Sequence, residues 1–295
     1  MLFRSVTDGN AGADYAVTFV TATGSITAVD LTATVTVNGR TYDGTTGATI
    51  ASCTLTGVVG TEDVTCDAAD ATATFASPHA GSRSVSISGL TLAGADAGNY
   101  TLASIAPVSA TIATRPITVT AATDTKPYDG TTSSSGTPTI TTGSLATGDS
   151  ATWTQSFDTK AVGTGKTLTP AGSVTDGNAG ADYAVTFVTA TGSITAVALT
   201  ATVTVDGRTY DGTTGATIAS CTLTGVVGTE EVTCDAADAT ATFESPHAGS
   251  RSVSISGLAL TGADAGNYTL ASNATATATI ATRPITVTAA TDTKP

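Results

Sequence analysis

The sequence predicts an all-β protein made of tandem modules, and three observations lead to this prediction. Thr, Ala, Gly, Ser and Val dominate the 295 residues, whereas residues that favour helices are scarce. Thr and Val favour strands, because branching at Cβ restricts χ1. The 31 glycines and the frequent Asp-Gly and Thr-Gly pairs supply turns at short intervals. The third observation is an internal repeat, which defines the modules.

The long repeat has a period of 168 residues. Residues 5–127 and 173–295 differ at 10 of 123 positions. A weaker copy of the Tyr-Asp-Gly-Thr-Thr motif begins 86 residues after Tyr42 and 82 before Tyr210, so the repeating unit has about 84 residues and alternates between two types. The predicted domains are a C-terminal part of a type B module (1–29), type A (30–114), type B (115–198), type A (199–282) and the N-terminal strand of a further type B module (283–295).

Each module is predicted to be a small β-sandwich. Apolar residues alternate with threonines along Leu31–Val37, and Tyr183, Val185 and Phe187 share one face, which is the period of a strand with one buried side. Turn signals fall about every 8–12 residues, as in sandwiches. The join Ala113–Ile117 has no flexible linker. We therefore expect an extended rod in which each module contacts only its neighbours.

The four cysteines form two pairs with equal spacing, Cys53 with Cys66 and Cys221 with Cys234. The residues between the members of each pair are expected to form a hairpin, which would set one cysteine opposite the other and allow a disulfide. An oxidising compartment suits such a bond. The alternative is two buried free thiols. Zinc is not expected, because a tetrahedral site needs four ligands and no second Cys or His pair lies close in sequence.

No cofactor is expected, although oxygen-rich turns leave calcium as an alternative. Calcium takes about six to eight oxygen ligands. The candidate turns lack a regular Asp-x-Asp spacing, and Asp and Asn commonly cap their own turns. These turns are Asp8-Gly9-Asn10, Asp67 with Asp70, and Asp96 near Asn99.

The motif that defines the repeat is a Tyr-Asp-Gly turn. Its tyrosine could be exposed for sugar or protein binding, but we expect it to anchor the turn on the core. The single Trp, Trp153, is expected to be partly buried. His79 and His247 are expected in surface loops, since nothing in the sequence selects a nucleophile or an orienting acid for them. The three turns are Tyr42-Asp43-Gly44, Tyr128-Asp129-Gly130 and Tyr210-Asp211-Gly212.

Charge and hydropathy exclude several classes of function. The net charge of −13 disfavours nucleic acid and anionic lipid as partners. No apolar run approaches the length of about 20 residues that spans a bilayer, so no membrane insertion is expected in this segment. Met1–Arg4 leads straight into repeat sequence, so an export signal would lie outside this chain or have been replaced.

The Tyr-Asp-Gly-Thr-Thr motif and the stretch Ser88–Leu102 together resemble the YDG-type repeat of large bacterial surface proteins, which include filamentous-haemagglutinin-like adhesins. Ser256–Leu270 repeats the stretch in the second type A module. Type B departs from it, with Ser173–Asn178 in place of Ser-Gly-Leu, and is a more diverged copy. The resemblance covers nearly the whole chain. It implies export, an extracellular or cell-surface location and a stalk or adhesive role, and it supplies no catalytic residue.

The predicted function is that of a structural repeat segment in a secreted adhesin stalk or an extracellular filament, and enzymatic activity is not expected. Its partners would be neighbouring repeats or identical chains; a host or surface ligand is not identified. One alternative is direct binding of glycan or protein by each repeat. Another is a filament joined by strand donation between chains. For that role Arg283–Ala289 is expected to form a strand, with Ile285 and Val287 as its apolar contacts.

Overall fold

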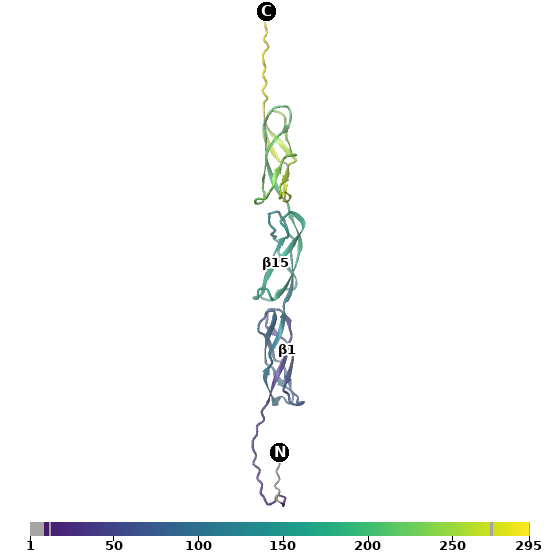
Figure 1. Ribbon diagram of the computed structural model, residues 1–295, viewed down its shortest axis with the longest axis vertical. Coiled ribbons are helices and arrows are strands. Elements are labelled where there is room, and N and C mark those ends of the chain that lie inside the picture. The colour runs from purple at the N-terminus through teal and green to yellow at the C-terminus, as the bar shows by residue number, and fades with distance from the viewer. Residues whose placement is uncertain (1–8, 12, 272–273, 295) are drawn as a thin grey trace. The chain divides into compact units, whose positions relative to one another are not determined.

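The computed structural model describes residues 9–11, 13–271 and 274–294 of the chain. Its contacts divide it into unit 1 (Met1–Thr41 and Thr45–Ala113) and unit 2 (Tyr42–Gly44 and Thr114–Pro295). Regular structure in the described residues is almost entirely β-strand (Figure 1). The exceptions are two single-turn helices, η1 (Ala97–Asn99) and η2 (Ala265–Asn267). The all-β prediction is therefore confirmed.

Unit 1 contains one type A module with two main sheets. The smaller sheet has the order β4-β1-β9, in which β1 pairs antiparallel with β4 and parallel with β9. Its strands are β1 (Val29–Val37), β4 (Ile50–Thr56) and β9 (Tyr100–Ile105). The larger sheet has the order β2-β10-β7-β6-β3. Its strands are β2 (Arg40–Thr41), β3 (Gly47–Ala48), β6 (Thr72–Phe75), β7 (Gly81–Ser88) and β10 (Val108–Ala113).

The core of this module follows the predicted alternation. Leu31, Ala33 and Val35 of β1 are buried, while the threonines between them are exposed. Phe75 and Ile112 of the larger sheet are buried as well. Beside the two sheets, β5 (Thr65–Asp67) and β8 (Thr91–Ala93) form a short antiparallel pair.

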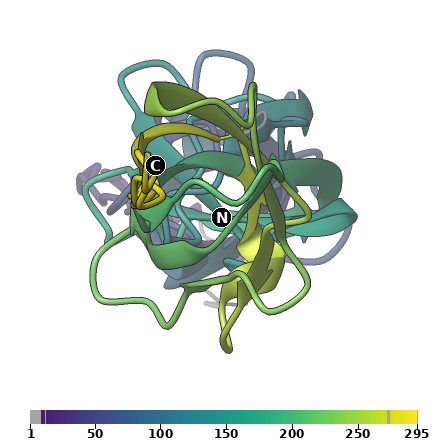
Figure 2. The same cartoon turned by 90° about the horizontal axis from the view of Figure 1, so that it is seen from above.

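The type A module of unit 2 has the same arrangement. Its sheets are β21-β18-β26, β19-β27-β24-β23-β20 and the pair β22-β25. Figure 2 looks down on this module, drawn from green to yellow. The strands are β18 (Val197–Val205), β19 (Arg208–Thr209), β20 (Gly215–Ala216), β21 (Ile218–Thr224), β22 (Thr233–Asp235), β23 (Thr240–Phe243), β24 (Gly249–Ser256), β25 (Ala259–Thr261), β26 (Tyr268–Leu270) and β27 (Thr275–Ala281).

Unit 2 also contains the type B module, whose sheets are β13-β11-β16 and β12-β17-β15-β14. Phe157, Leu168 and Ile194 form the buried centre of this module. The long strand β15 is labelled in Figure 1. The strands are β11 (Arg115–Thr120), β12 (Thr125–Pro127), β13 (Thr139–Thr142), β14 (Ser150–Phe157), β15 (Gly163–Thr175), β16 (Tyr183–Val188) and β17 (Ala190–Thr195).

Both expected disulfides are present, but the hairpin that led to them is wrong. Cys53 is bonded to Cys66, and Cys221 to Cys234, with the two Cα atoms of each bond 5.8 Å apart. Cys53 lies on β4 opposite Val35, whereas Cys66 lies on β5 opposite Leu92. Each disulfide therefore connects two different sheets of its module. The sequence between the cysteines turns away, because each strand finds its hydrogen-bond partner elsewhere in the chain.

The strand expected at Arg283–Ala289 is also wrong in this structure, and the described part of the N-terminal segment forms no strand either. Residues 14–28 and 282–294 have no assigned strand, and Ile285 and Val287 are 83% and 87% exposed. Arg115–Thr120 has the same sequence as Arg283–Thr288 at the C-terminal end. It forms β11 because it pairs with β13 and with β16. For the C-terminal segment, the given sequence contains no counterpart of β13, and its counterpart of β16 lies at the other end of the sequence. Without these pairs, the backbone hydrogen bonds that define a strand are not made.

Replacing Cys53 and Cys66 together by alanine should lower the free energy of unfolding of unit 1. The closed loop is short, so the chain-entropy model gives a loss of about 3 kcal/mol. Urea denaturation followed by circular dichroism measures this loss, and Cys221→Ala with Cys234→Ala is the matched change in unit 2. Alkylation without reductant checks the premise: labelling of four thiols per chain would contradict it.

Candidate functional site at the module junction of unit 2

The Tyr-Asp-Gly turn of the type B module follows β12 directly, and its aspartate builds the turn. Asp129 Oδ1 accepts hydrogen bonds from the backbone N of Thr131 at 2.9 Å and from its Oγ1 at 2.8 Å. The same atom accepts from Lys126 Nζ at 2.7 Å, which holds the pKa of Asp129 down at about 2. Gly130 has φ +76°, a conformation that glycine adopts without strain.

The tyrosine of this turn is buried in a pocket of the following type A module. Tyr128 is 3% exposed, and its ring meets the ring of Tyr268 edge-on, with 5.5 Å between centroids. Its hydroxyl donates to Glu230 Oε1. Tyr268 donates to the other oxygen of Glu230 at 2.6 Å and accepts from the backbone N of Val227 at 3.0 Å. One carboxylate therefore joins the tyrosines of two modules.

Other parts of the type B module complete the contact. Lys160 Nζ donates to Glu230 Oε1 at 2.7 Å. The backbone N of Val162 donates to Asn267 Oδ1 at 3.0 Å. A Cβ atom at Gly130 would lie 3.1 Å from Val227 Cγ1, so the glycine also permits close approach of the two modules. We call Tyr128, Gly130, Lys160 and Val162 the B end, and Val227, Glu230, Asn267 and Tyr268 the receiving pocket.

The hydrophobic core is continuous across this junction. Tyr128, Phe157 and Leu168 of the type B module belong to the same buried cluster as Leu199 and Tyr268 of the type A module. A module of about 84 residues has only a small core of its own. Burying an aromatic ring from the neighbour enlarges that core, and the edge-on ring pair is worth about 0.5–1.5 kcal/mol beyond its area.

The electrostatics of the junction favour an ionised carboxylate and neutral tyrosines. Burial alone would raise the pKa of Glu230, but hydrogen bonds from Lys160, Tyr128 and Tyr268 hold it at about 2. Burial and the hydrogen bond to Glu230 raise the pKa of Tyr268 to about 12 and raise that of Tyr128. Lys160 remains protonated, since its hydrogen bonds to Glu230 and Tyr128 raise its pKa. The donors Tyr128, Tyr268 and Lys160 all bind the carboxylate of Glu230, so hydrogen bonds and charge are balanced within the junction. Such a balance is typical of a structural contact.

Unit 2 contains a second site with the same geometry. The segment Tyr42–Gly44 belongs to unit 2, where the ring of Tyr42 meets that of Tyr183 edge-on at 5.5 Å. Both hydroxyls donate to Asp149, Tyr183 at 2.6 Å and Tyr42 at 3.5 Å. Tyr183 also accepts from the backbone N of Ala146 at 2.7 Å. Arg115 Nη1 donates to the carbonyl of Tyr42 at 3.3 Å.

The third Tyr-Asp-Gly turn has no receiving pocket among the described residues. Asp211 builds its turn as Asp129 does, accepting from the backbone N and Oγ1 of Thr213 at 2.9 Å each. Tyr210 is 38% exposed, and a Cβ atom at Gly212 would meet nothing within 4 Å. Tyr128 is thus anchored on a core, but its pocket belongs to the following type A module and not to the module that carries the turn.

The other candidate residues make hydrogen bonds within their own module. Asp67 Oδ1 accepts from the backbone N of Ala69 at 2.9 Å, and Asp96 Oδ2 from that of Asp63 at 2.8 Å. The carbonyls of His79 and His247 accept hydrogen bonds from Arg83 and Arg251. The described ranges contain no group of three or more His, Cys, Asp or Glu that could hold a metal ion. Asp8 lies outside those ranges.

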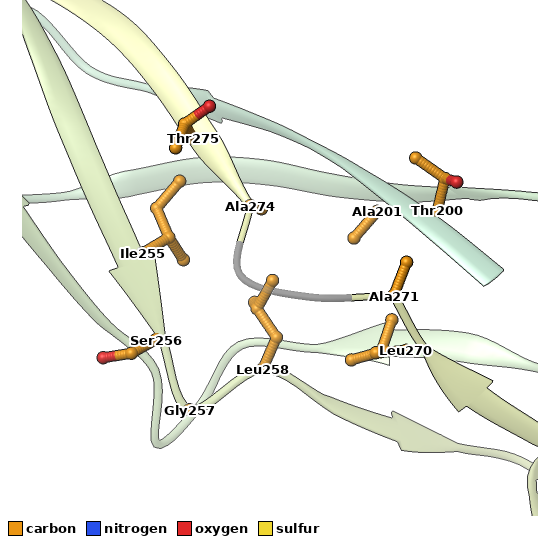
Figure 3. A pocket seen from close by; sticks show the side chains of 10 residues that line it. All are labelled: Thr200, Ala201, Ile255, Ser256, Gly257, Leu258, Leu270, Ala271, Ala274 and Thr275. Carbon is orange, nitrogen blue, oxygen red and sulfur yellow. The ribbon is translucent and has the colours of Figure 1, made fainter. Parts of the chain in front are cut away.

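Unit 2 has two further features of the kind that can bind a ligand, an aromatic pair and a pocket. Trp153 is half-buried, and its ring packs edge-on against Phe187, with 5.9 Å between centroids. A pocket of about 450 Å³ lies in the type A module of unit 2, where β26 and β27 diverge (Figure 3). Its lining is formed by small or apolar side chains such as Ile255, Leu258 and Leu270, together with Thr200, Ser256 and Thr275. It contains no charged group that would direct a chemical reaction.

The receiving pocket is not marked by any short sequence motif. Glu230 and Lys160 are 70 residues apart, and Tyr128 is 102 residues from Glu230, so no short motif contains them. A signal was present in the repeat itself. A tyrosine recurs at positions 100, 183 and 268, and each of these residues is buried.

Comparison with known proteins gives one matching family and several structural likenesses. A family model described as the YDG domain matches residues 27–108, 113–192 and 195–278. No curated protein matches the chain. Eight chains of solved structures match, among them the Escherichia coli adhesin FdeC, at 14% identity over 88% of this chain and 99% of that chain. Its TM-score is 0.24, so this likeness carries no further argument. No helix in the described ranges is long and apolar enough to cross a membrane.

Glu230→Gln should weaken the junction of unit 2. The amide keeps the size of the carboxylate but cannot accept from both tyrosines and Lys160, which leaves buried donors without full partners. We expect the free energy of unfolding to fall by about 1–3 kcal/mol, measured by urea denaturation followed by circular dichroism, which reports on both units. Glu62→Gln is the matched control in unit 1, where Glu62 accepts from Tyr100. A loss at Glu230 no larger than at Glu62 would argue against the junction.

The same carboxylate should make the junction sensitive to acid. The folded-state pKa of Glu230, about 2, lies below the value of about 4.3 for an unfolded glutamate, so ionisation stabilises the folded form. This stabilisation is present well above pH 4.3 and is lost as the pH falls toward 2. Urea midpoints of Trp153 fluorescence at several pH values from 6 to 2 measure it. In Glu230→Gln this part of the pH dependence should disappear; an unchanged profile would refute the assignment.

Proposed function

Because this chain belongs to the YDG domain family, we propose that it is a structural repeat segment of a secreted bacterial adhesin stalk or extracellular filament, which holds or forms a fibre at the cell surface. The filamentous-haemagglutinin-like adhesins are the class that its repeat resembles. The segment itself would be non-enzymatic. Its partners would be neighbouring repeats.

The observation that carries this proposal is the junction of unit 2. Two modules share one hydrophobic cluster, and a buried carboxylate binds a tyrosine from each. Such a contact fixes the orientation of one module on the next, which is what a stalk requires and an isolated binding module does not. Each added repeat would then lengthen the stalk without changing its local structure.

The disulfides and the composition support an extracellular location. Each type A module has one disulfide, and such bonds persist in oxidising compartments such as the periplasm and cell surface. The many exposed Thr and Ser side chains and the net charge of −13 keep a long repeat array soluble. Neither feature identifies a ligand on a host or another surface.

One alternative, a filament joined by strand donation, also has an observation in its favour. In the type B module, β11 and β16 pair in parallel, with Ile117 opposite Val185 and Val119 opposite Phe187. The identical residues at the ends of the chain are Ile285 with Val17 and Val287 with Phe19, and all four are exposed. The C-terminal segment of one chain could therefore pair with the N-terminal segment of the next. Direct binding of glycan or protein has no comparable support.

Small-angle X-ray scattering tests the stalk proposal. A stiff array of three modules should give a maximum dimension far above that of a compact protein of 28.7 kDa. A radius of gyration close to about 19 Å, the value for a globular chain of this length, would contradict it.

Deletion of residues 283–295 separates the stalk from the strand-donated filament. The stalk proposal predicts the same sedimentation behaviour for the full and shortened chains at every concentration, because no other chain is needed. Chains that associate, and that lose this association on deletion, would favour strand donation. Ile285→Asp with Val287→Asp is the matched variant that keeps the chain length.

A further inference from the structure

Unit 1 contains a receiving pocket of the same composition as that of unit 2. Tyr100 accepts from the backbone N of Val59 at 3.0 Å and donates to Glu62, as Tyr268 does with Val227 and Glu230. The four residues Val59, Glu62, Asn99 and Tyr100 are identical to those of the pocket in unit 2. Together with Ile26–Val29 they line a pocket of about 430 Å³.

The two pockets differ in what covers them. In unit 2, where the B end is seated, Asn267 is 9% exposed and Glu230 and Val227 are half-buried. In unit 1 the equivalent residues Asn99, Glu62 and Val59 are exposed, Val59 to 53%. The tyrosine and the acid are nevertheless already joined by their hydrogen bond. The pocket of unit 1 is therefore preformed for a B end.

The B end brings the positive charge that this type of pocket lacks. Lys160 follows Phe157 by three residues and binds Glu230. In the type A modules, the residues three positions after Phe75 and Phe243 are Pro78 and Pro246. A type A end in the same pocket would thus leave the half-buried carboxylate with its tyrosine donors but without the charge-assisted hydrogen bond from the lysine.

The pocket of the type B module has the opposite arrangement. Arg115, which lies opposite Tyr183 in the sheet, donates to the carbonyl of the incoming Tyr42. The residues that lie opposite Tyr100 and Tyr268 are Val29 and Val197. One cation therefore lies at each site: Lys160 of the type B end, which binds the carboxylate, and Arg115 beside Tyr42, which binds the carbonyls of Tyr42 and Ser144. A junction of two type A modules would have neither cation, and a junction of two type B modules would have both.

We propose that the pocket of unit 1 is a docking site for the Tyr-Asp-Gly end of a type B module, and that it excludes type A ends through this rule of one cation per junction. The rule rests on the proposed stalk and specifies its partner: modules join only in alternating order. It uses the chemistry seen in unit 2, namely a tyrosine, a lysine and an apolar side chain on a Tyr–Glu pair.

The test extends the full chain at its N-terminus. Placing a copy of residues 115–172 directly before Ser5 completes a type B module, because Ser5–Val29 is identical to Ser173–Val197. Hydrogen exchange of the peptide 58–64 is then compared with that of 226–232, which differs in mass because Asp63 is replaced by Glu231. We expect exchange of 58–64 to slow at least about tenfold and to approach that of 226–232. Unchanged exchange would overturn the docking site.

A second pair of variants tests the charge rule. In the extended chain, the added lysine that corresponds to Lys160 is changed to methionine. Exchange of the peptide 58–64 should then become about tenfold faster than in the extended parent chain. Val29→Arg in that variant supplies the cation from the pocket, as Arg115 does, and should restore the slow exchange. Restoration excludes misfolding as the cause of the loss. A methionine variant that exchanges as slowly as its parent, or an arginine that restores nothing, would overturn the rule. Scattering from the same chains reports separately on the stalk.

Discussion

The structure of unit 2 depends on the shared carboxylate of Glu230. It lies between two modules, and it accepts from a tyrosine of each and from Lys160. A half-buried negative charge is stable only when it is paired and hydrogen-bonded, and this one is bound by three donors. The donors come from elements far apart in sequence, so the carboxylate can be satisfied only when the modules are seated against each other. Folding and junction formation are thereby linked.

Each residue of the Tyr-Asp-Gly motif has a different role at this junction. The aspartate stays within its own module and forms the turn with Thr131. The glycine gives the turn its positive φ and leaves room for Val227. The tyrosine alone crosses to the next module, where it joins the core. A motif that looks like an ordinary turn in sequence is therefore the element that connects repeats, and this explains why it marks each module once.

The sequence predicted what depends on local pattern and repeat, and it missed what depends on distant pairing. The alternation in Leu31–Val37 located a strand and its buried face. The cysteine pairs were correct, yet the hairpin was wrong, because β4 and β5 each pair with strands that sequence spacing does not reveal. The C-terminal segment Arg283–Ala289 was expected to be a strand, but the identical β11 exists only because it pairs with β13 and β16. The roles of Glu230 and Lys160 could not be predicted, since neither residue belongs to a sequence motif.

A double-mutant cycle on Tyr128 and Glu230 tests the central claim most directly. Tyr128→Phe removes only the hydroxyl that donates to Glu230, and Glu230→Gln removes the charge that accepts it. Unfolding free energies of the two single variants and the double variant, measured by urea denaturation with Trp153 fluorescence, give the coupling between the two side chains. The account predicts a coupling energy of about 1–3 kcal/mol. Losses that add to within about 0.3 kcal/mol would contradict it, since they would show that the two modules are not joined through this bond.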